Sequence, residues 1–303
     1  MAMSDSRKKK LAMLTRSIAR GDFAGATRVI QSGGTPDGAA EADRHGEPQS
    51  GPILLADACP GTEAEVRTPA GRGKYWLIRR ALDEIGADGA AVSRQLAAIL
   101  RGARQRFDEL GASADLCRAA DARPEDLLFL DLETCGFSGT GIFLVGTMFF
   151  TDGRFVCEQH FARTYPEEPA ILHALADRYA RTPLLVTFNG KAFDMNMVRE
   201  RAAFHGVELP EQPPAHLDLL HESRRLWRGR TPNCRLQTLE RRFCGRVRIG
   251  DIPGAAIPDA YHRFVDTGDA RQVRDIIHHN LLDMLTMAQL LCAALTGCEP
   301  GGQ

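Results

Sequence analysis

Residues 127–133 read LLFLDLE, an apolar run that leads directly into two carboxylates separated by one leucine. A continuous apolar run of this length, without strict alternation, predicts a strand that is buried on both faces. Side chains alternate along a strand, so Asp131 and Glu133 point to the same side. Two carboxylates this close repel each other unless a positive charge lies between them, and a divalent metal ion with oxygen ligands is a suitable one. An isolated acid pair is more often simply solvated, so the case for a site depends on further ligands.

The composition is that of an ordinary globular protein of 303 residues, with 44% hydrophobic residues, 25% charged residues and a net charge of -1. This length suits one sizeable domain and a smaller one. The eight cysteines form no CxxC pair, which favours reduced thiols over disulfides or a zinc site. The basic N-terminus lacks an apolar run behind it, and no stretch approaches the roughly 20 apolar residues of a membrane span. We therefore expect a cytoplasmic protein without a membrane partner.

The pattern after Pro124 predicts a mixed α/β sheet. Three strands follow one another, with a hairpin signal at Asp152-Gly153, and two further strands alternate with helices. Helical crossovers give a five-stranded, partly antiparallel sheet with helices on both faces. The expected strands span 127–132, 142–150, 155–161, 184–188 and 216–220, and the expected helices include 166–180, 193–205 and 269–295.

The first part of the chain, residues 1–123, is predicted to be a mainly helical accessory region, separate from a domain over 124–297. Helices are expected within 7–31 and over 91–110, and a small hairpin is expected between 65 and 78. The stretch near 31–62 contains Gly, Pro, Ala and acids with few large apolar residues, which indicates a flexible linker.

Two further acids are candidates to join the first pair. Asp194 follows the strand over 184–188 at a helix start, and ligand sites in such sheets gather at the carboxyl ends of strands. A helix-capping role is the alternative for this residue. Asp283 lies one helical turn after His279, on the same face, whereas His278 points away on a regular helix. Asp218, at the end of another strand, has a weaker claim.

These motifs resemble the DEDD superfamily of ribonuclease H-like 3′–5′ exonucleases. DLE at 131–133, FNGKAFD at 188–194 and HHNLLD at 278–283 occur in the order that the superfamily requires. The longer segments over 127–146, 216–227, 234–245, 250–264 and 279–287 resemble the YprB-type ribonuclease H-like domain. The resemblance covers roughly 124–293 and implies a ribonuclease H-like fold for the nuclease domain at 124–297.

The resemblance also implies the roles of the site residues. The metal-binding carboxylates would be Asp131, Glu133, Asp194 and Asp283, holding two Mg²⁺ or Mn²⁺ ions and no other cofactor. The superfamily has either a histidine five residues before the last acid or a tyrosine four residues before it. This chain has histidine at both positions, His278 and His279. The helix face favours His279 as the group that orients or deprotonates the attacking water.

A polyanionic substrate needs cations, and a basic run supplies them. Nine arginines and a single acid, Glu240, lie between residues 224 and 248. A solvated basic face is the alternative, but beside a nuclease centre such a run favours phosphate binding. The expected nucleic-acid contacts are Lys191, Arg224, Arg225, Trp227, Arg228 and Arg235, with Trp227 stacking on a base and Lys191 alternatively a solvated lysine.

The sequence therefore predicts a metal-dependent 3′–5′ exonuclease acting on DNA or RNA, with single-stranded ends as its partner. Two alternatives stay open at this point. One is an endonuclease with the same four acids, and the other is a noncatalytic nucleic-acid-binding module. The clustered acids speak against the second, because a binding module gains nothing from repulsive charge.

Overall fold

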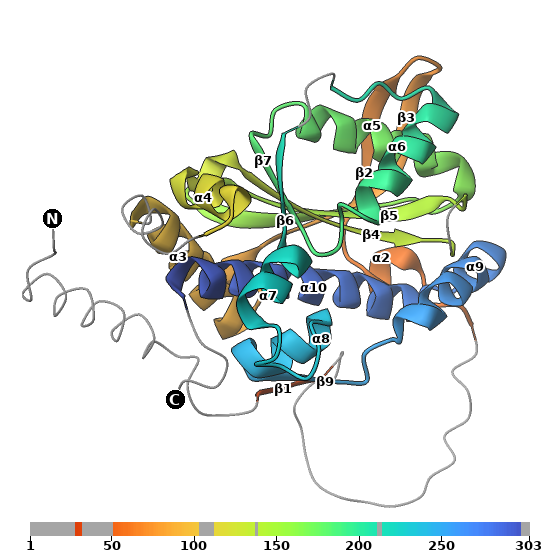
Figure 1. Ribbon diagram of the computed structural model, residues 1–303. Coiled ribbons are helices and arrows are strands. Elements are labelled where there is room, and N and C mark those ends of the chain that lie inside the picture. The colour runs from red at the N-terminus through yellow and green to blue at the C-terminus, as the bar shows by residue number, and fades with distance from the viewer. Residues whose placement is uncertain (1–27, 32–50, 103–111, 137–138, 211–213, 298–303) are drawn as a thin grey trace, which may run out of the picture.

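A computed structural model describes residues 28–31, 51–102, 112–136, 139–210 and 214–297 (Figure 1). Within these ranges a seven-stranded mixed sheet has the order β2-β3-β6-β5-β4-β7-β8, and a separate pair joins β1 to β9. The strands of the large sheet are β2 Thr62–Thr68, β3 Gly71–Ala81, β4 Leu127–Thr134, β5 Ile142–Thr151, β6 Arg154–Phe161, β7 Leu184–Thr187 and β8 Ala215–Asp218. The small pair consists of β1 Arg28–Gln31 and β9 Arg246–Ile249.

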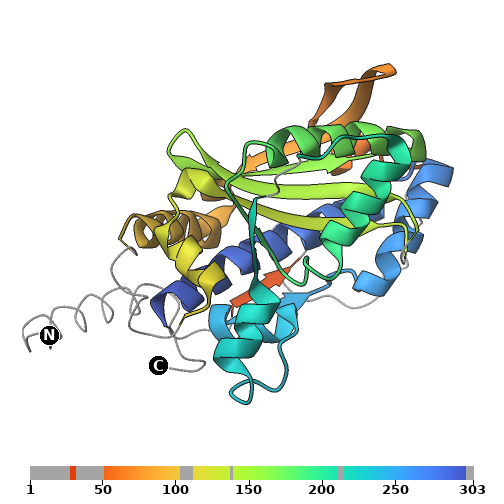
Figure 2. The same cartoon turned by 45° about the horizontal axis from the view of Figure 1, so that its top comes forward.

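Helices cover both faces of the large sheet (Figures 1 and 2). One face carries α5 and α6, and the other carries α3 and the long α10. The helices are α2 Leu55–Ala58, α3 Gly86–Gly102, α4 Ala114–Asp121, α5 Glu168–Tyr179, α6 Asp194–His205, α7 Leu219–Trp227, α8 Leu236–Leu239, α9 Ile257–Thr267 and α10 Arg271–Thr296.

Both faces of the central strand β4 are buried, which explains its continuous apolar sequence. Leu127 and Phe129 pack into the core beneath α10, whereas Leu128 and Leu130 pack into the core beneath α5 and α6. Because side chains alternate, Asp131 and Glu133 continue the row of Leu127 and Phe129 toward α10. The strand is antiparallel to β5 and parallel to β7, so it is paired on both edges.

The sequence-based fold class is confirmed as a mixed α/β, ribonuclease H-like arrangement, but the sheet is larger than five strands. The hairpin β2–β3 pairs antiparallel with β6, with Trp76 opposite Phe161, and adds two strands at one edge. Its far end projects beyond the neighbouring strands in Figure 2. The sheet therefore includes residues from before position 124, and the division of the chain into 1–123 and 124–297 stays a prediction.

The N-terminal region also contains more strand than expected. Residues 28–31, expected at the end of a helical stretch, form β1, which runs parallel to β9. The other expected helical residues, 7–27, and most of the expected linker, 32–50, lie outside the described residues. Residues 91–102 of the expected helix over 91–110 belong to α3, which begins earlier, at Gly86, and the remaining residues, 103–110, lie outside the described residues.

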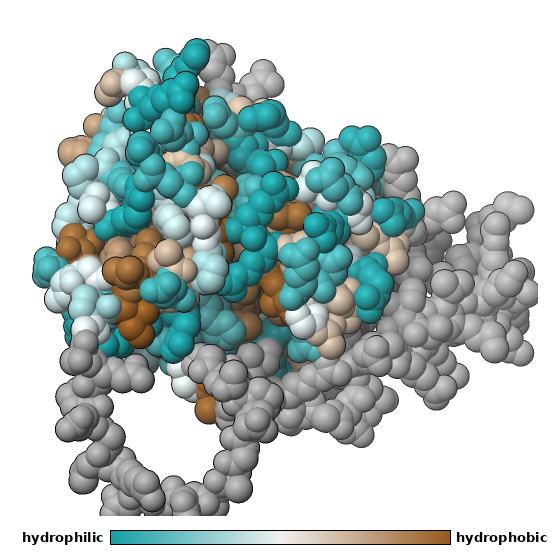
Figure 3. All heavy atoms as spheres, turned by 180° about the vertical axis from the view of Figure 1, so that it is seen from behind, coloured by the Kyte–Doolittle hydropathy of each residue, from teal (hydrophilic) through white to brown (hydrophobic). Residues whose placement is uncertain are grey.

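Most of the surface on the face shown in Figure 3 is hydrophilic, and the hydrophobic residues there gather in separate small areas. Among the described residues, no helix is both long and apolar enough to cross a membrane.

Candidate functional site

The four predicted carboxylates come from three elements that meet at the carboxyl end of β4. Asp131 and Glu133 lie on β4, Asp194 is the first residue of α6, and Asp283 lies on α10. Asp194 is buried, and the backbone of Leu132 in β4 hydrogen-bonds to it. The charges of Asp283, Glu133 and Asp194 all act on Asp131, so the acids form one electrostatic cluster.

The turn that delivers Asp194 is organised by Asp218, at the end of β8. Asp218 Oδ1 accepts hydrogen bonds from the backbone N–H groups of Asn189 and Leu220, both at 2.9 Å, and Oδ2 accepts one from Lys191 N–H at 3.0 Å. Asn189 adopts a positive φ of 68°, a left-handed backbone conformation that is typical of tight turns. Asp218 therefore acts as a structural anchor for the turn before α6.

Asp131 is held by an amide from α10. Asn280 is fully buried, and its Nδ2 donates to Asp131 Oδ2 at 2.7 Å. Gln159 Nε2 on β6 donates to Asn280 Oδ1 at 2.9 Å and to the Ile277 carbonyl at 2.7 Å. The space for this amide exists because residue 146, opposite Asp131 on β5, is a glycine. A side chain here would overlap Asn280.

Arg248, the last arginine of the basic run, contacts Asp283, and Asp251, three residues later, contacts His279. Arg248 Nη2 donates to Asp283 Oδ1 at 2.5 Å, and its Nε donates to Glu240 Oε2 at 2.7 Å. His279 Nδ1 lies 2.9 Å from Asp251 Oδ2, and His279 Nε2 lies 3.5 Å from Asp283 Oδ2. The imidazole thus bridges two carboxylates, one inside the acidic cluster and one outside it.

Burial and mutual repulsion make all four acids harder to ionise. Burial raises the pKa of Asp131 well above its usual value, and the neighbouring carboxylates raise it further. Burial likewise raises the pKa of Glu133 to about 8 and that of Asp194 to about 7. Burial also raises the pKa of Asp283, although Arg248 and His279 oppose this. A nearby cation would relieve this strain on every member of the cluster.

The imidazole beside the acids shifts in the opposite sense. Burial alone would lower the pKa of His279, but the hydrogen bond to Asp251 and the charges of Asp283 and Glu133 outweigh it and raise the pKa. The pKa of Asp251 is lowered, because His279 and Arg248 together overcome its burial. Both shifts therefore favour the charged form of each partner, as expected for a hydrogen-bonded imidazole and carboxylate.

The donor set fits a hard divalent cation, because it consists of carboxylate oxygens that burial has left without enough positive charge. The side-chain arrangement is not that of a preformed site. Among the described residues no group of three or more His, Cys, Asp or Glu side chains is placed to hold a metal ion. Arg248 instead supplies the charge to Asp283. This ion pair occupies Oδ1 of Asp283, and the other oxygen, Oδ2, faces His279.

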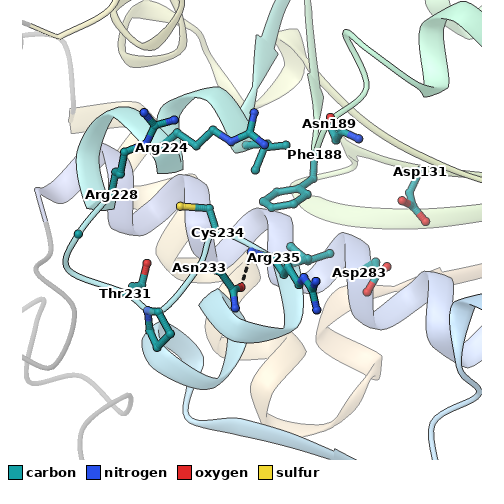
Figure 4. Close-up of a pocket in the computed structure, with 14 residues that line it drawn as sticks. Asp131, Phe188, Asn189, Arg224, Arg228, Thr231, Asn233, Cys234, Arg235 and Asp283 are labelled. Atoms are coloured by element: carbon teal, nitrogen blue, oxygen red, sulfur yellow. Dashed lines mark hydrogen bonds between the residues drawn. The ribbon is translucent and has the colours of Figure 1, made fainter.

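A cavity of about 740 Å³ opens beside the acidic cluster. Asp131 and Asp283 lie at one end and Arg224 and Arg228 at the other, with Arg235 between them (Figure 4). The wall also includes the ring of Phe188 and the polar residues Asn189, Thr231 and Asn233. The site therefore combines an acidic end with a basic channel.

Three of the six predicted nucleic-acid contacts are engaged elsewhere. Lys191 Nζ pairs with Asp115 at 2.7 Å, and Arg225 Nε donates to Glu222 Oε2 at 2.9 Å. Trp227 is only 3% exposed and packs 4.2 Å from the ring of Phe243, so the expectation of base stacking is corrected to a role in the core. Phe188 is the aromatic residue that lines the cavity.

The two candidate histidines are separated by the helix as the spacing predicts. His279 faces the acids, whereas His278 lines a small apolar cavity of about 100 Å³ with Leu82, Ile85 and Leu281. Burial lowers the pKa of His278, which keeps it neutral among these apolar neighbours.

Sequence reasoning missed the residues that support the acids. Asn280 lies within the HHNLLD motif, and its place one turn before Asp283 was a usable signal. Arg248 was counted only among the basic residues, and Asp251 carried no signal except its place in the segment over 250–264. Arg248 lies on β9, and Asp251 lies on the irregular stretch between β9 and α9, whose path the local sequence does not define.

A mixed sheet whose central strand carries paired acids, joined by acids from flanking helices, defines a ribonuclease H-like protein. The family model of the RNase H superfamily matches residues 128–294, more than half of the chain, and the chain belongs to this superfamily. Its members are generally hydrolases that act on nucleic acids, and they usually use divalent metals.

The chain is also similar in part to one curated protein and to one solved structure. The uncharacterized protein YprB of Bacillus subtilis (strain 168) is 34% identical over 169 residues, which cover 54% of this chain and 41% of the relative. The chain therefore matches about two fifths of that relative's length. The family B DNA polymerase of the hyperthermophilic archaeon Pyrobaculum calidifontis is 18% identical, with a TM-score of 0.43 over 54% of this chain and 24% of the polymerase.

Proposed function

We propose that this chain is a divalent-metal-dependent 3′–5′ exonuclease that hydrolyses phosphodiester bonds at single-stranded DNA or RNA ends. The observation that carries the proposal is the convergence of Asp131, Glu133, Asp194 and Asp283 from β4, α6 and α10. These acids are buried enough to raise their pKa values, and they adjoin a cavity lined by arginines. Such repulsive charge is costly to hold together and is useful when it binds a cation.

When bound, Mg²⁺ or Mn²⁺ would be held by these four carboxylates and would stabilise the negative charge that develops on the reacting phosphate. The chain's own residues perform the remaining tasks. Asn280 fixes the orientation of Asp131, and the Asp218-anchored turn fixes Asp194. Arg248 is available to hold Asp283 before the metal arrives.

The chemical step is hydrolysis of the bond between phosphorus and the 3′ oxygen. The water oxygen attacks phosphorus, and His279 Nε2 takes one of the water protons. The 3′ oxygen leaves with the bonding electrons and takes a proton from solvent. His279 suits this role because its Nδ1 side is engaged by Asp251 and its Nε2 side faces Asp283.

The substrate strand would lie along the cavity. Arg224, Arg228 and Arg235 would contact backbone phosphates, and Phe188 would stack on a base. These contacts carry no base-specific pattern, so we expect weak sequence preference. The preference for single strands follows from the ring of Phe188, because stacking needs an exposed base face.

The test is degradation of end-labelled single-stranded DNA and RNA with Mg²⁺ or Mn²⁺ by the parent and by Asp131→Asn. We expect stepwise shortening from the 3′ end by the parent and a loss of at least about 10²-fold in the variant, because its metal ligand set is incomplete. Asp126→Asn, on the turn before β4, is a matched control that keeps parental activity. Internal cuts would reassign the protein as an endonuclease, and equal rates for Asp131→Asn and parent would refute the active site.

A noncatalytic nucleic-acid-binding module is the second candidate, because Arg248 already gives Asp283 a cationic partner. Thermal unfolding separates the two functions without an activity assay. A metal-binding nuclease shows a Tm that rises with Mg²⁺ or Mn²⁺ concentration, and the rise is lost in Asp131→Asn. A binding module retains single strands without cleavage and shows the same Tm with and without metal.

A further inference from the structure

The imidazole of His279 is held by a hydrogen bond at Nδ1, and its Nε2 faces the acidic cluster. Nδ1 lies 2.9 Å from Asp251 Oδ2, and Nε2 lies 3.5 Å from Asp283 Oδ2. The residue is 8% exposed and sits on α10, whereas Asp251 belongs to the segment that links β9 to α9. The contact therefore joins two parts of the fold that are not neighbours in sequence.

The contact with Asp251 selects one form of the neutral ring. An ionised carboxylate only accepts hydrogen bonds, so Nδ1 must carry the proton that it donates to Asp251. Nε2 is then the unprotonated nitrogen, with its lone pair directed toward the acidic cluster. A ring that was free to turn would place either nitrogen there.

We propose that Asp251 is a positioning residue that holds the His279 ring with Nε2 toward the reacting water. The inference rests on the proposed function, since it assigns a task within the same site. Among the described residues, Asp251 forms no hydrogen bond or ion pair with the four carboxylates. Its proposed effect on the reaction passes through the imidazole.

The alternative is that Asp251 merely neutralises Arg248, whose Nη1 lies 3.2 Å from the same Oδ2 atom. The network around Arg248 argues against this. Glu240 accepts from Arg248 at 2.7 Å and 3.3 Å, and Asp283 accepts at 2.5 Å, so the guanidinium is well paired without Asp251.

The geometry of the Asp251 carboxylate agrees with a role centred on His279. Both contacts converge on Oδ2, while the buried Oδ1 has no hydrogen-bond partner among the described side chains and backbone groups. A carboxylate placed only for stability would be expected to satisfy both oxygens. The side chain is instead turned so that one oxygen meets Nδ1 at close range.

A double-mutant cycle tests the proposal on the full chain with a 3′-labelled single strand and Mg²⁺ or Mn²⁺. We expect Asp251→Ala to lower kcat by about 10- to 100-fold with KM unchanged, as for other residues that orient a catalytic histidine. Asp251→Asn keeps the shape and one acceptor oxygen, so it recovers part of this loss. Asp126→Asn serves as the matched control.

The decisive comparison is made in the His279→Ala background. Because Asp251 acts through the ring, adding Asp251→Ala to His279→Ala lowers kcat no further. An equal loss in both backgrounds would mean that Asp251 works through Arg248 or through general stability, and the proposal would be overturned. Parental kcat for Asp251→Ala would overturn it as well.

A second measurement is independent of catalysis. In ¹⁵N-labelled, metal-free protein, at a pH high enough for the ring to be neutral, the His279 resonances are identified by their loss in His279→Gln. They then report which ring nitrogen carries the proton. We expect protonated Nδ1 in the parent and a mixture of tautomers in Asp251→Ala and Asp251→Asn. Identical spectra would refute the positioning role. A parent without nuclease activity would refute the proposed function, and this spectrum would still decide the role of Asp251.

Discussion

Replacing Gly146 with alanine provides a sharp test of how the site is built. Gly146 lies opposite Asp131 in the ladder between β4 and β5, and it has no positive φ. The backbone conformation therefore suits any residue, and in open space the substitution would stabilise by about 0.4–1 kcal/mol. Here, however, the added Cβ would overlap Asn280 Oδ1, with Asn280 Nδ2 at 2.7 Å and Cγ at 2.8 Å.

The cost follows from what Asn280 must give up. The fully buried amide has backbone on one side and Gln159 on the other, so it can make room only by leaving its hydrogen bonds. Overpacking of a tight core costs about 1–3 kcal/mol, and loss of the bond to the Asp131 carboxylate adds about 1.5 kcal/mol. After the favourable backbone effect, we expect Gly146→Ala to destabilise by about 1.5–4 kcal/mol.

The assay is urea unfolding of the metal-free protein, with a lower midpoint and an unchanged m-value. In a thermal scan the same change lowers Tm by roughly 2–6 °C, as the size of the unfolding entropy implies. Gly254→Ala is the matched control, because Gly254 also lacks a positive φ but has open space around its Cβ position. In the Asn280→Ala background, Gly146→Ala should cost nothing further. Parental stability of Gly146→Ala would refute the steric argument.

Three further predictions concern other parts of the molecule. Burial lowers the pKa of His160 to about 4, so below about pH 6.5 the unfolded chain binds a proton that the folded protein does not, and stability falls by up to about 3 kcal/mol between pH 6.5 and pH 4. His160→Gln should flatten this part of the pH profile of urea unfolding, and a variant profile that runs parallel to that of the parent would contradict the prediction. Glu168 accepts hydrogen bonds from Arg201 and from Ile142 N–H, which lower its pKa, so the stability that it contributes is present above pH 4.5 and is lost as pH falls through the folded pKa. Glu168→Gln should therefore lower the free energy of unfolding by about 3 kcal/mol at pH 7 and by progressively less in acid. Arg228→Ala should weaken single-strand binding equally for all sequences and reduce the slope of log K against log salt by about 0.7, whereas an unchanged slope would remove Arg228 from the binding surface.

The elements that sequence could predict are those governed by local pattern. The apolar run before Asp131 predicted a central strand, because a strand that is buried on both faces has no position for a polar side chain. The hairpin at Asp152-Gly153 and the strands around it also follow from local signals, and Asp152 does adopt the positive φ of 51° that such a turn needs. The predicted strand over 184–188 is found as β7 within one residue.

What sequence could not predict depends on long-range pairing. The hairpin β2–β3 was expected, but its union with β6 joins Trp76 to Phe161 across a long stretch of chain, and neither strand encodes its partner. The same limit applies to Trp227, which an arginine-rich segment marked as a base-stacking residue. Its ring lies on the inner side of α7, against Phe243, because the packing of the helix decides which side faces the core.

The acids themselves show where the energy that maintains the site originates. Asp131, Asp194 and Asp283 repel one another, so their own interactions cannot bring β4, α6 and α10 together. That task falls to α10, which is apolar on nearly every side and packs against the sheet and α3. Three polar side chains of this helix each contact a different partner: His279 contacts Asp251, Asn280 contacts Asp131, and Asp283 contacts Arg248. The hydrophobic core thus holds the repelling carboxylates in place, and the amide and the arginine set their orientation. The positions of the three backbone segments therefore do not depend on whether the charges of the acids are neutralised.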